Sequence, residues 1–109
     1  MVMKVAWSAR AKAEFRKVLI YINLEFGKKP AQEFADKVDQ WVIWMSENPE
    51  MSPQEQLLAD RVILYRSRKV GKYNKLIFKN TATTLYIVDL WDMRREPSYL
   101  ASRIRSKKK

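Results

Sequence analysis

Two residue types that commonly carry chemistry are absent from this chain of 109 residues, which contains neither cysteine nor histidine. The absence of cysteine excludes a disulfide scaffold, a thiol nucleophile and a thiolate metal site. The absence of histidine removes the commonest general base and the commonest zinc ligand. We therefore expect no metal and no cofactor, and any acid–base chemistry must use Glu, Asp, Lys, Tyr or Arg.

Long hydrophobic runs are missing as well, since no apolar stretch approaches the roughly 20 residues that span a bilayer. The N-terminal segment MVMKVAWSAR acquires charge too early for a signal peptide. Hydrophobic residues make up 47% of the chain, which is enough to build the core of one domain. We expect one cytoplasmic domain over residues 1–109 without a membrane partner, and a frayed tail at residues 106–109.

The excess of positive charge lies in the second half of the chain, and the net charge of the whole is +10. Residues 1–60 contain eight Lys and Arg against nine Asp and Glu, whereas residues 61–109 contain fourteen against three. A separation of this kind predicts a polyanionic partner, either nucleic acid or an acidic protein. No Gly-rich phosphate loop, zinc-binding spacing or aromatic RNA-binding motif accompanies it, which argues against a generic nucleic-acid-binding module.

The first half has helical spacing. Alternating apolar residues at 3–7 predict a short strand, and Ser8 follows it at a position suited to cap a helix. Apolar residues spaced by three and four predict one helix over 11–26 and a second over 30–45. Pro30 is well placed in the first turn of the second helix. The connection is short, so the two helices should form an antiparallel hairpin.

The second half has the composition of a sheet. β-Branched and aromatic residues predict strands at 62–65, 73–79 and 85–91, and the last is apolar nearly throughout, as in a central strand. Pro97 opens a short final helix. The order β-α-α-β-β-β-α predicts an α+β fold. In it, the antiparallel helical hairpin packs on one face of a mostly antiparallel sheet of three to four strands.

An ordered set of motifs along nearly the whole chain resembles the RelE/ParE superfamily of toxins from bacterial type II toxin–antitoxin (plasmid stabilisation) modules. The motifs are Val5-Ala6-Trp7-Ser8, Ile20-Tyr21-Ile22, Ala31-x-x-Phe34, Asn48-Pro49, Tyr73-x-Lys75-Leu76-Ile77-Phe78 and Ile87-Val88-Asp89-Leu90-Trp91-Asp92-Met93-Arg94-Arg95-x-Pro97. Their order carries the resemblance, because each motif alone is weakly specific.

The resemblance implies growth inhibition by one of two mechanisms. RelE-like members resemble metal-independent, ribosome-dependent endoribonucleases, which bind RNA, cut mRNA in the ribosomal A site and block translation. ParE-like members resemble DNA gyrase poisons without a catalytic site of their own. In both groups a cognate antitoxin protein holds the toxin inactive. The implied partners are therefore an antitoxin together with the ribosome and mRNA, or alternatively DNA gyrase.

Cleavage of RNA through its 2′-hydroxyl needs a base, a cation for the phosphorane and an acid for the leaving oxygen. The resemblance assigns catalytic roles to Lys75, Arg94, Arg95 and Tyr99. Substrate binding is predicted for Arg61, Arg66, Arg68 and Lys69. Antitoxin binding is predicted for Trp41, Trp44 and Met45, because they lie close together and a core of this size does not fully bury four tryptophans. Met93 stands where some members carry a catalytic histidine.

Each assigned residue also has an ordinary structural interpretation. Arg94 and Arg95 could pair with neighbouring carboxylates, Lys75 could lie on a solvated strand face, and Tyr99 could cover core. Helices of about 18 residues are typical of ParE-like members, whereas cations clustered on the sheet favour a nuclease. Because of these cations, the sequence slightly favours the ribosome-dependent endoribonuclease, with the gyrase poison as the alternative.

Overall fold

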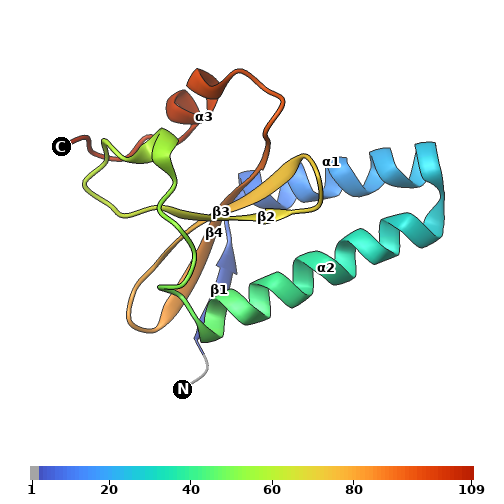
Figure 1. Ribbon diagram of the computed structural model, residues 1–109, viewed down its shortest axis with the longest axis horizontal. Coiled ribbons are helices and arrows are strands. Elements are labelled where there is room, and N and C mark those ends of the chain that lie inside the picture. Colours follow the sequence, from blue (N-terminus) through green and yellow to red (C-terminus); the bar gives the residue numbers. More distant parts are fainter. Residues whose placement is uncertain (1–2) are drawn as a thin grey trace.

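A helical hairpin covers one face of a sheet, and a short third helix lies against the other face (Figure 1). The computed structural model describes residues 3–109. The elements are β1 (Lys4–Trp7), α1 (Ala9–Phe26), α2 (Lys28–Glu47), a 3₁₀ turn η1 (Gln56–Leu58), β2 (Arg66–Val70), β3 (Asn74–Asn80), β4 (Thr84–Asp92) and α3 (Pro97–Arg103). This order and its α+β class are those that the sequence predicts.

Within residues 3–109 the strands form one sheet in the order β1-β4-β3-β2. The pairs β2–β3 and β3–β4 are antiparallel, whereas β1 runs parallel to β4. The nine-residue β4 therefore lies inside the sheet, and Leu85, Ile87 and Trp91 on it are almost fully buried. An apolar strand without strict alternation suits this position, because both of its faces are covered.

Local signals set the start of α1 and the turn between the two helices. The Ser8 hydroxyl accepts the Ala11 N–H at 3.0 Å and donates to the Val88 carbonyl at 2.9 Å, so one side chain caps α1 and fastens it to β4. Gly27 joins α1 to α2 with φ of 101°, a conformation that favours glycine.

The two faces of the sheet carry separate apolar clusters. On the hairpin face, Val38 and Met45 of α2 pack with Leu76 and Phe78 of the sheet. On the opposite face, Trp91 packs with residues from η1, β3 and the C-terminal segment, namely Leu58, Tyr65, Ile77, Leu100 and Ile104. The second cluster is what holds the C-terminal segment and the η1 loop beside the cationic residues of the sheet.

The prediction of a strand at residues 62–65 is wrong. Residues 62–65 lie outside the sheet, and β2 begins only at Arg66. Val62, Ile63 and Leu64 are exposed, and the Val62 N–H donates to the Lys107 carbonyl at 2.8 Å. The tail also differs from expectation: backbone hydrogen bonds tie 107–109 to 60–62, so it is held in place instead of fraying.

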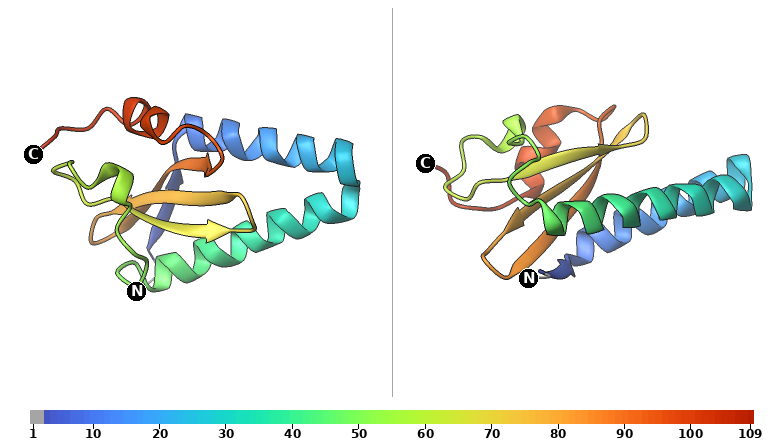
Figure 2. Two further views of the ribbon diagram at one scale, coloured as in Figure 1. Left: turned by 45° about the horizontal axis from the view of Figure 1, so that its top comes forward. Right: turned by 60° about the horizontal axis from the view of Figure 1, so that its bottom comes forward.

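The helical hairpin extends well beyond the sheet (Figure 2). The end of the apolar stripe predicted on α1 therefore has no sheet beneath it, and Phe26, predicted in the core, is 66% exposed. Leu24 is 78% exposed and Ile20 53% exposed on the same stretch. In residues 3–109, no helix has the length and apolarity needed to cross a membrane.

Candidate functional site

The sheet face opposite the helical hairpin gathers three cations around Trp91. Trp91 of β4 stands opposite Lys75 of β3 in the antiparallel register, so the two side chains share a face. The guanidinium carbons of Arg95 and Arg103 lie 5.0 and 5.3 Å from the Trp91 ring centroid. Cations at this distance are attracted to the indole ring, which therefore organises the group. We call Lys75, Trp91, Arg95 and Arg103 the Trp91 cluster.

Lys75 is tied to a carboxylate that the sequence did not single out. Its Nζ lies 2.5 Å from Oε1 of Glu55, and the side chains are 15% and 3% exposed. The second carboxylate oxygen of Glu55 accepts the Leu57 N–H at 2.9 Å and so caps η1. An acidic residue just before a short helical turn was the available signal for Glu55 as a cap. Both oxygens of Glu55 are thus in use.

Arg94 and Arg95 are adjacent in sequence but stack on different aromatic rings. The Arg94 guanidinium donates to both oxygens of Asp92, at 3.0 and 2.8 Å, and its carbon lies 4.1 Å from the Tyr73 ring centroid. These hydrogen bonds from Arg94 lower the pKa of Asp92. Arg94 is thus already bound to a carboxylate, and only Arg95 of this pair joins Trp91.

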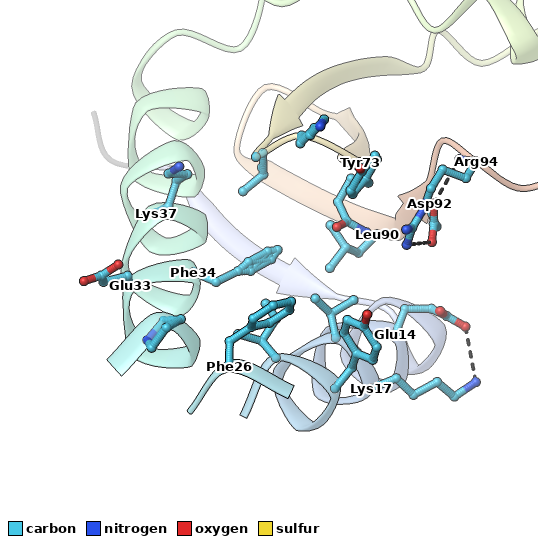
Figure 3. Close-up of a pocket in the computed structure, with 18 of the residues that line it drawn as sticks. Glu14, Lys17, Phe26, Glu33, Phe34, Lys37, Tyr73, Leu90, Asp92 and Arg94 are labelled. Carbon is cyan, nitrogen blue, oxygen red and sulfur yellow. Dashed lines mark hydrogen bonds and ion pairs between the residues drawn. The ribbon is translucent and has the colours of Figure 1, made fainter. Parts of the chain in front are cut away.

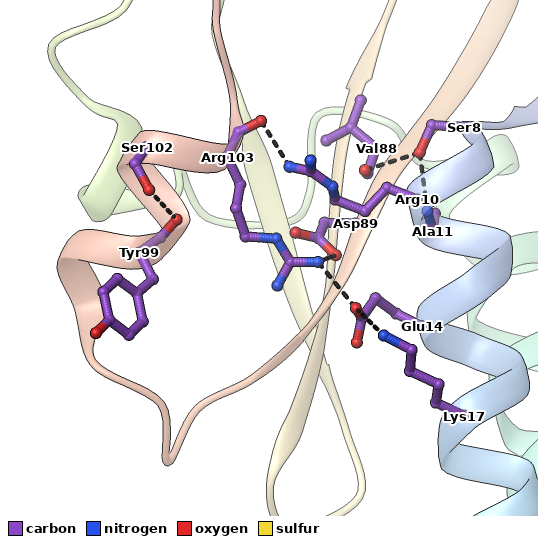
Figure 4. Close-up of polar contacts among 10 residues, drawn as sticks. All are labelled: Ser8, Arg10, Ala11, Glu14, Lys17, Val88, Asp89, Tyr99, Ser102 and Arg103. Carbon is purple, nitrogen blue, oxygen red and sulfur yellow. Dashed lines mark hydrogen bonds and ion pairs between the residues drawn. The ribbon is translucent and has the colours of Figure 1, made fainter.

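Tyr99 of α3 does not join the cluster. Its ring is 57% exposed, and Figure 4 shows it directed away from the Arg103 guanidinium. Of the four residues predicted to be catalytic, Arg95 stacks on the Trp91 ring, and Lys75 stands opposite Trp91 in the register. Arg94 stacks on Tyr73 instead, and Tyr99 is exposed.

Arg61 is placed inside the protein. It is 3% exposed and its guanidinium donates to the backbone carbonyls of Ala101, at 2.6 Å, and Ile104. It is also paired with the exposed Asp60 carboxylate at 3.1 Å. Predicted to bind substrate, Arg61 instead fastens the C-terminal segment to the chain after η1.

The other residues predicted to bind substrate differ in exposure. Arg66 donates to the Ser52 carbonyl at 2.7 Å, and Arg68 donates to the Ser52 hydroxyl at 3.2 Å. Lys69 of β2 is exposed and pairs in register with Lys75. Among the four residues predicted to bind substrate, Lys69 therefore extends the Trp91 cluster along the sheet.

The tryptophans predicted to bind antitoxin hold Arg68 against α2. The Arg68 guanidinium carbon lies 5.0 Å from the Trp41 ring centroid and 4.8 Å from the Trp44 ring centroid. Both indoles are partly buried and keep some exposed surface. Met45 is fully buried in the core beneath them, so it offers no surface to a partner.

A buried network of charged groups lies beside the Trp91 cluster (Figure 4). Arg103 Nη2 lies 3.1 Å from the Glu14 carboxylate and 3.3 Å from that of Asp89. Arg10 donates to the Arg103 carbonyl at 2.7 Å. Burial raises the pKa of Asp89, and the positive charge of Arg103 opposes that shift. This network fixes α3 against α1, and no role was predicted for Arg103.

An apolar groove of about 710 Å³ lies between the two helices and the turn that joins β2 to β3 (Figure 3). Phe26, Phe34 and Tyr73 line it, together with the cations Lys17 and Lys37. The groove continues into the exposed apolar end of the hairpin. Phe26 and Phe34 belong to the apolar spacing that predicts the two helices, and that spacing does not reveal where the supporting sheet ends.

Three solved structures share this architecture. A chain of the chromosomal ParDE TA system from P. aeruginosa matches over 84% of this chain and 96% of its own, with a TM-score of 0.68 and 11% identity. The YoeB/ParE toxin from Agrobacterium tumefaciens matches over 83% and 98%, with a TM-score of 0.58 and 11% identity. The Staphylococcus aureus YoeB dimer matches over 83% and 95%, with a TM-score of 0.59 and 13% identity.

The chain therefore has the fold of RelE/ParE superfamily toxins, as the sequence motifs predict. No protein-family model matches the chain, and no curated protein matches it significantly. Because one fold serves members with different activities, the choice between those activities depends on the site.

Proposed function

We propose that this protein is the toxin of a type II toxin–antitoxin pair, and that it disables its target by binding instead of by catalysis. The toxin role is supported by the fold shared with ParE and YoeB toxins. The binding mechanism corresponds to the ParE-like branch of the superfamily, which implies DNA gyrase as the target. This choice reverses the slight preference that the clustered cations gave the nuclease.

The observation behind this choice is that the groups needed for cleavage already have partners within the chain. Lys75 is paired with Glu55 and Arg94 with Asp92, while Tyr99 is exposed on α3. A transition state is stabilised by preorganised donors that converge on one phosphate. Arg95 and Lys69 are exposed and suit attraction to a polyanionic or acidic surface, which requires no such convergence.

One contact favours a second candidate function, the ribosome-dependent endoribonuclease. Glu55 and Lys75 place a carboxylate and an ammonium group 2.5 Å apart, next to the ring that carries Arg95. Such a pair offers a proton acceptor and a proton donor within hydrogen-bond reach. In this mechanism Glu55 takes the 2′-hydroxyl proton, Arg95 stabilises the phosphorane and the Lys75 ammonium gives a proton to the leaving 5′-oxygen.

We propose that the antitoxin occupies the apolar groove and the exposed end of the hairpin. The groove combines aromatic side chains with five Lys and Arg against three Asp and Glu, and this cationic excess suits an amphipathic segment that carries acidic residues. The partly exposed Trp41 and Trp44 remain a second proposed contact for the antitoxin. An apolar end of this size exposed on a small domain is typical of a partner surface.

Two assays run side by side distinguish the two functions. Purified protein is added to a gyrase supercoiling and DNA-cleavage reaction, and to a cell-free translation reaction whose mRNA ends are mapped. We expect gyrase-dependent DNA breaks with intact mRNA. Mapped mRNA cleavage that is abolished by Glu55→Gln, with gyrase unaffected, would establish the second candidate instead.

The toxin role itself is tested by expression in bacteria and by the neighbouring gene. Induction should arrest growth, and co-expression of a small protein with an acidic end and a DNA-binding N-terminal part, encoded beside the gene, should restore it. Normal growth on induction, together with the absence of such a neighbour, contradicts the proposal.

A further inference from the structure

A second hollow, of about 650 Å³, lies where the N-terminus of α1 meets the C-terminal segment. The side chains of Lys79, Arg105 and Lys107 in its lining have had no role assigned so far. The hollow draws on α1, β3, β4, the chain before β2 and the C-terminal segment. The residues that line it are Ser8, Ala9, Arg10, Ile63, Tyr65, Lys79, Val88, Arg103, Ile104, Arg105, Ser106 and Lys107. We call it the C-terminal cavity.

The charge of this lining is entirely of one sign. It contains five Lys and Arg and no Asp or Glu. Arg103 is occupied by Glu14 and Asp89, but among residues 3–109 no carboxylate lies within ion-pair distance of Lys79, Arg105 or Lys107. Like charges gathered without counter-charges repel one another, and an anion placed among them removes that repulsion.

The end of α1 adds to the positive potential. Ser8, Ala9 and Arg10 form its first turn and line the cavity, and the N-terminus of an 18-residue helix carries partial positive charge. The opposite wall is apolar. Tyr65 and Val88 pack in the core beneath it, and Ile63 is 37% exposed. A flat apolar group therefore has a surface to lie on beside the cations.

We propose that the C-terminal cavity binds a phosphate of a nucleotide, with the attached base or sugar resting on the apolar wall. The volume is that of an ordinary small-ligand site, where a few polar groups fix an otherwise apolar ligand. The ligand is either a nucleotide unit within single-stranded nucleic acid or a free nucleotide, since both offer the same phosphate chemistry. The site is independent of the toxin role, because none of its free cations belongs to the Trp91 cluster.

The experiment measures binding of a fluorescein-labelled single strand of about eight nucleotides, a length within the range that such sites cover. The triple variant Lys79→Gln/Arg105→Gln/Lys107→Gln removes the free cations of the cavity. The matched control Arg16→Gln/Lys28→Gln/Lys29→Gln removes the same charge and the same residue types from exposed helix positions outside it. Fluorescence anisotropy is recorded over a salt series.

We expect the cavity variant to lose at least tenfold in affinity at about 0.1 M salt, and its log–log salt slope to become shallower by about 2, from three lost phosphate contacts. The control should stay within about threefold of the parent under the same conditions. An equal loss in both variants overturns the proposal, because it means that only net charge matters. The double variant Arg105→Gln/Lys107→Gln, which changes two exposed side chains, repeats the test if the triple variant melts early.

Competition identifies the source of the phosphate. If ADP displaces the probe as effectively as the unlabelled strand does, the ligand is a free nucleotide. If only the unlabelled strand displaces it, the ligand is nucleic acid. A polyglutamate peptide that competes as well as either makes the cavity a site for acidic protein and overturns the nucleotide assignment. No readout in this experiment depends on growth arrest, so its failure is distinct from failure of the proposed function.

Discussion

The Nζ of Lys75 lies 2.5 Å from Oε1 of Glu55, and this ion pair joins the middle of β3 to the turn η1. Both side chains are largely covered. A buried charge costs free energy unless an opposite charge pairs with it, so each side chain of this pair requires the other as its counter-charge. The pair therefore controls how the η1 loop sits over the sheet face that carries the Trp91 cluster.

Removing one member of this pair should destabilise the fold. We expect Lys75→Met to lower the free energy of unfolding by about 3 kcal/mol, since it leaves the Glu55 carboxylate buried and unpaired. The double variant Glu55→Gln/Lys75→Met should recover more than half of that loss. Urea denaturation of the parent and of these two variants measures the loss of stability and its recovery. A double variant no more stable than Lys75→Met argues that the pair is not coupled.

Arg61→Met should loosen the C-terminal segment. The substitution leaves the carbonyls of Ala101 and Ile104 without their donor, at a cost of about 2–4 kcal/mol. Hydrogen exchange at the Val62 and Lys109 amides should accelerate as well, because both pair across this junction. Arg16→Met, on an exposed helix position, is the control and should change neither quantity. Unchanged exchange in Arg61→Met contradicts the tethering role.

Two aspartates should affect stability with opposite dependence on pH. Hydrogen bonds from Arg94 lower the pKa of Asp92, so its contribution is present above the ordinary value of 3.8 and is lost as pH falls through the lowered pKa. Burial raises the pKa of Asp89, so its ionised form costs stability above that pKa, and the cost is relieved as pH falls toward 3.8.

The measurement is the melting temperature between pH 7 and pH 3 for the parent, Asp89→Asn and Asp92→Asn. On acidification, the stability of the parent relative to Asp92→Asn should fall. Its stability relative to Asp89→Asn should rise. The groups that face Asp89 are Arg103, Glu14 and Arg10, and all three stay intact in the variants. Parallel curves for the parent and Asp89→Asn would mean that Asp89 keeps its ordinary pKa.

Leu24→Glu should weaken antitoxin binding without weakening the fold. Leu24 is 78% exposed at the end of the hairpin, so a charge there is tolerated by the free protein but opposes an apolar partner. We expect at least a tenfold increase in the antitoxin Kd by calorimetry, with the melting temperature nearly constant. Val62→Glu changes another exposed aliphatic residue, remote from the groove, and should leave the Kd alone.

Arg95→Ala should reduce inhibition of the target more than Arg94→Ala does. Arg95 is exposed over Trp91, whereas Arg94 is bound to Asp92. We expect about a tenfold loss of inhibition for Arg95→Ala, which corresponds to about 1.4 kcal/mol. The dose of protein that gives half-maximal inhibition measures both variants. Equal effects would place the target contact elsewhere.

Much of the fold was predictable because its signals are local. Ser8 as a cap, the spacing of apolar residues on two helices and Pro97 before α3 each act within a few residues, and each prediction is confirmed. Residues 62–65 have strand composition but no pairing partner in the sheet, and composition alone cannot supply one.

The candidate site was less predictable because side-chain partners come from distant segments. Arg61 looked like a surface cation, yet residues some 40 positions later bury it. Arg94 and Arg95 are neighbours with equal charge, and only the three-dimensional structure assigns one to Asp92 and the other to Trp91. The pairing of Glu55 with Lys75 had no sequence signal, because the two residues meet only after the sheet has formed.

The parallel pairing of β1 with β4 has a consequence for the time course of folding. Lys4 aligns with Thr84, so the first strand waits for a partner that is synthesised 80 residues later. Pairings so distant in sequence form slowly, whereas the helical hairpin has only local contacts to make. During synthesis the helices should therefore form on the ribosome well before the sheet closes. The nascent chain cannot adopt its complete fold until β4 has emerged, which delays any activity until that point.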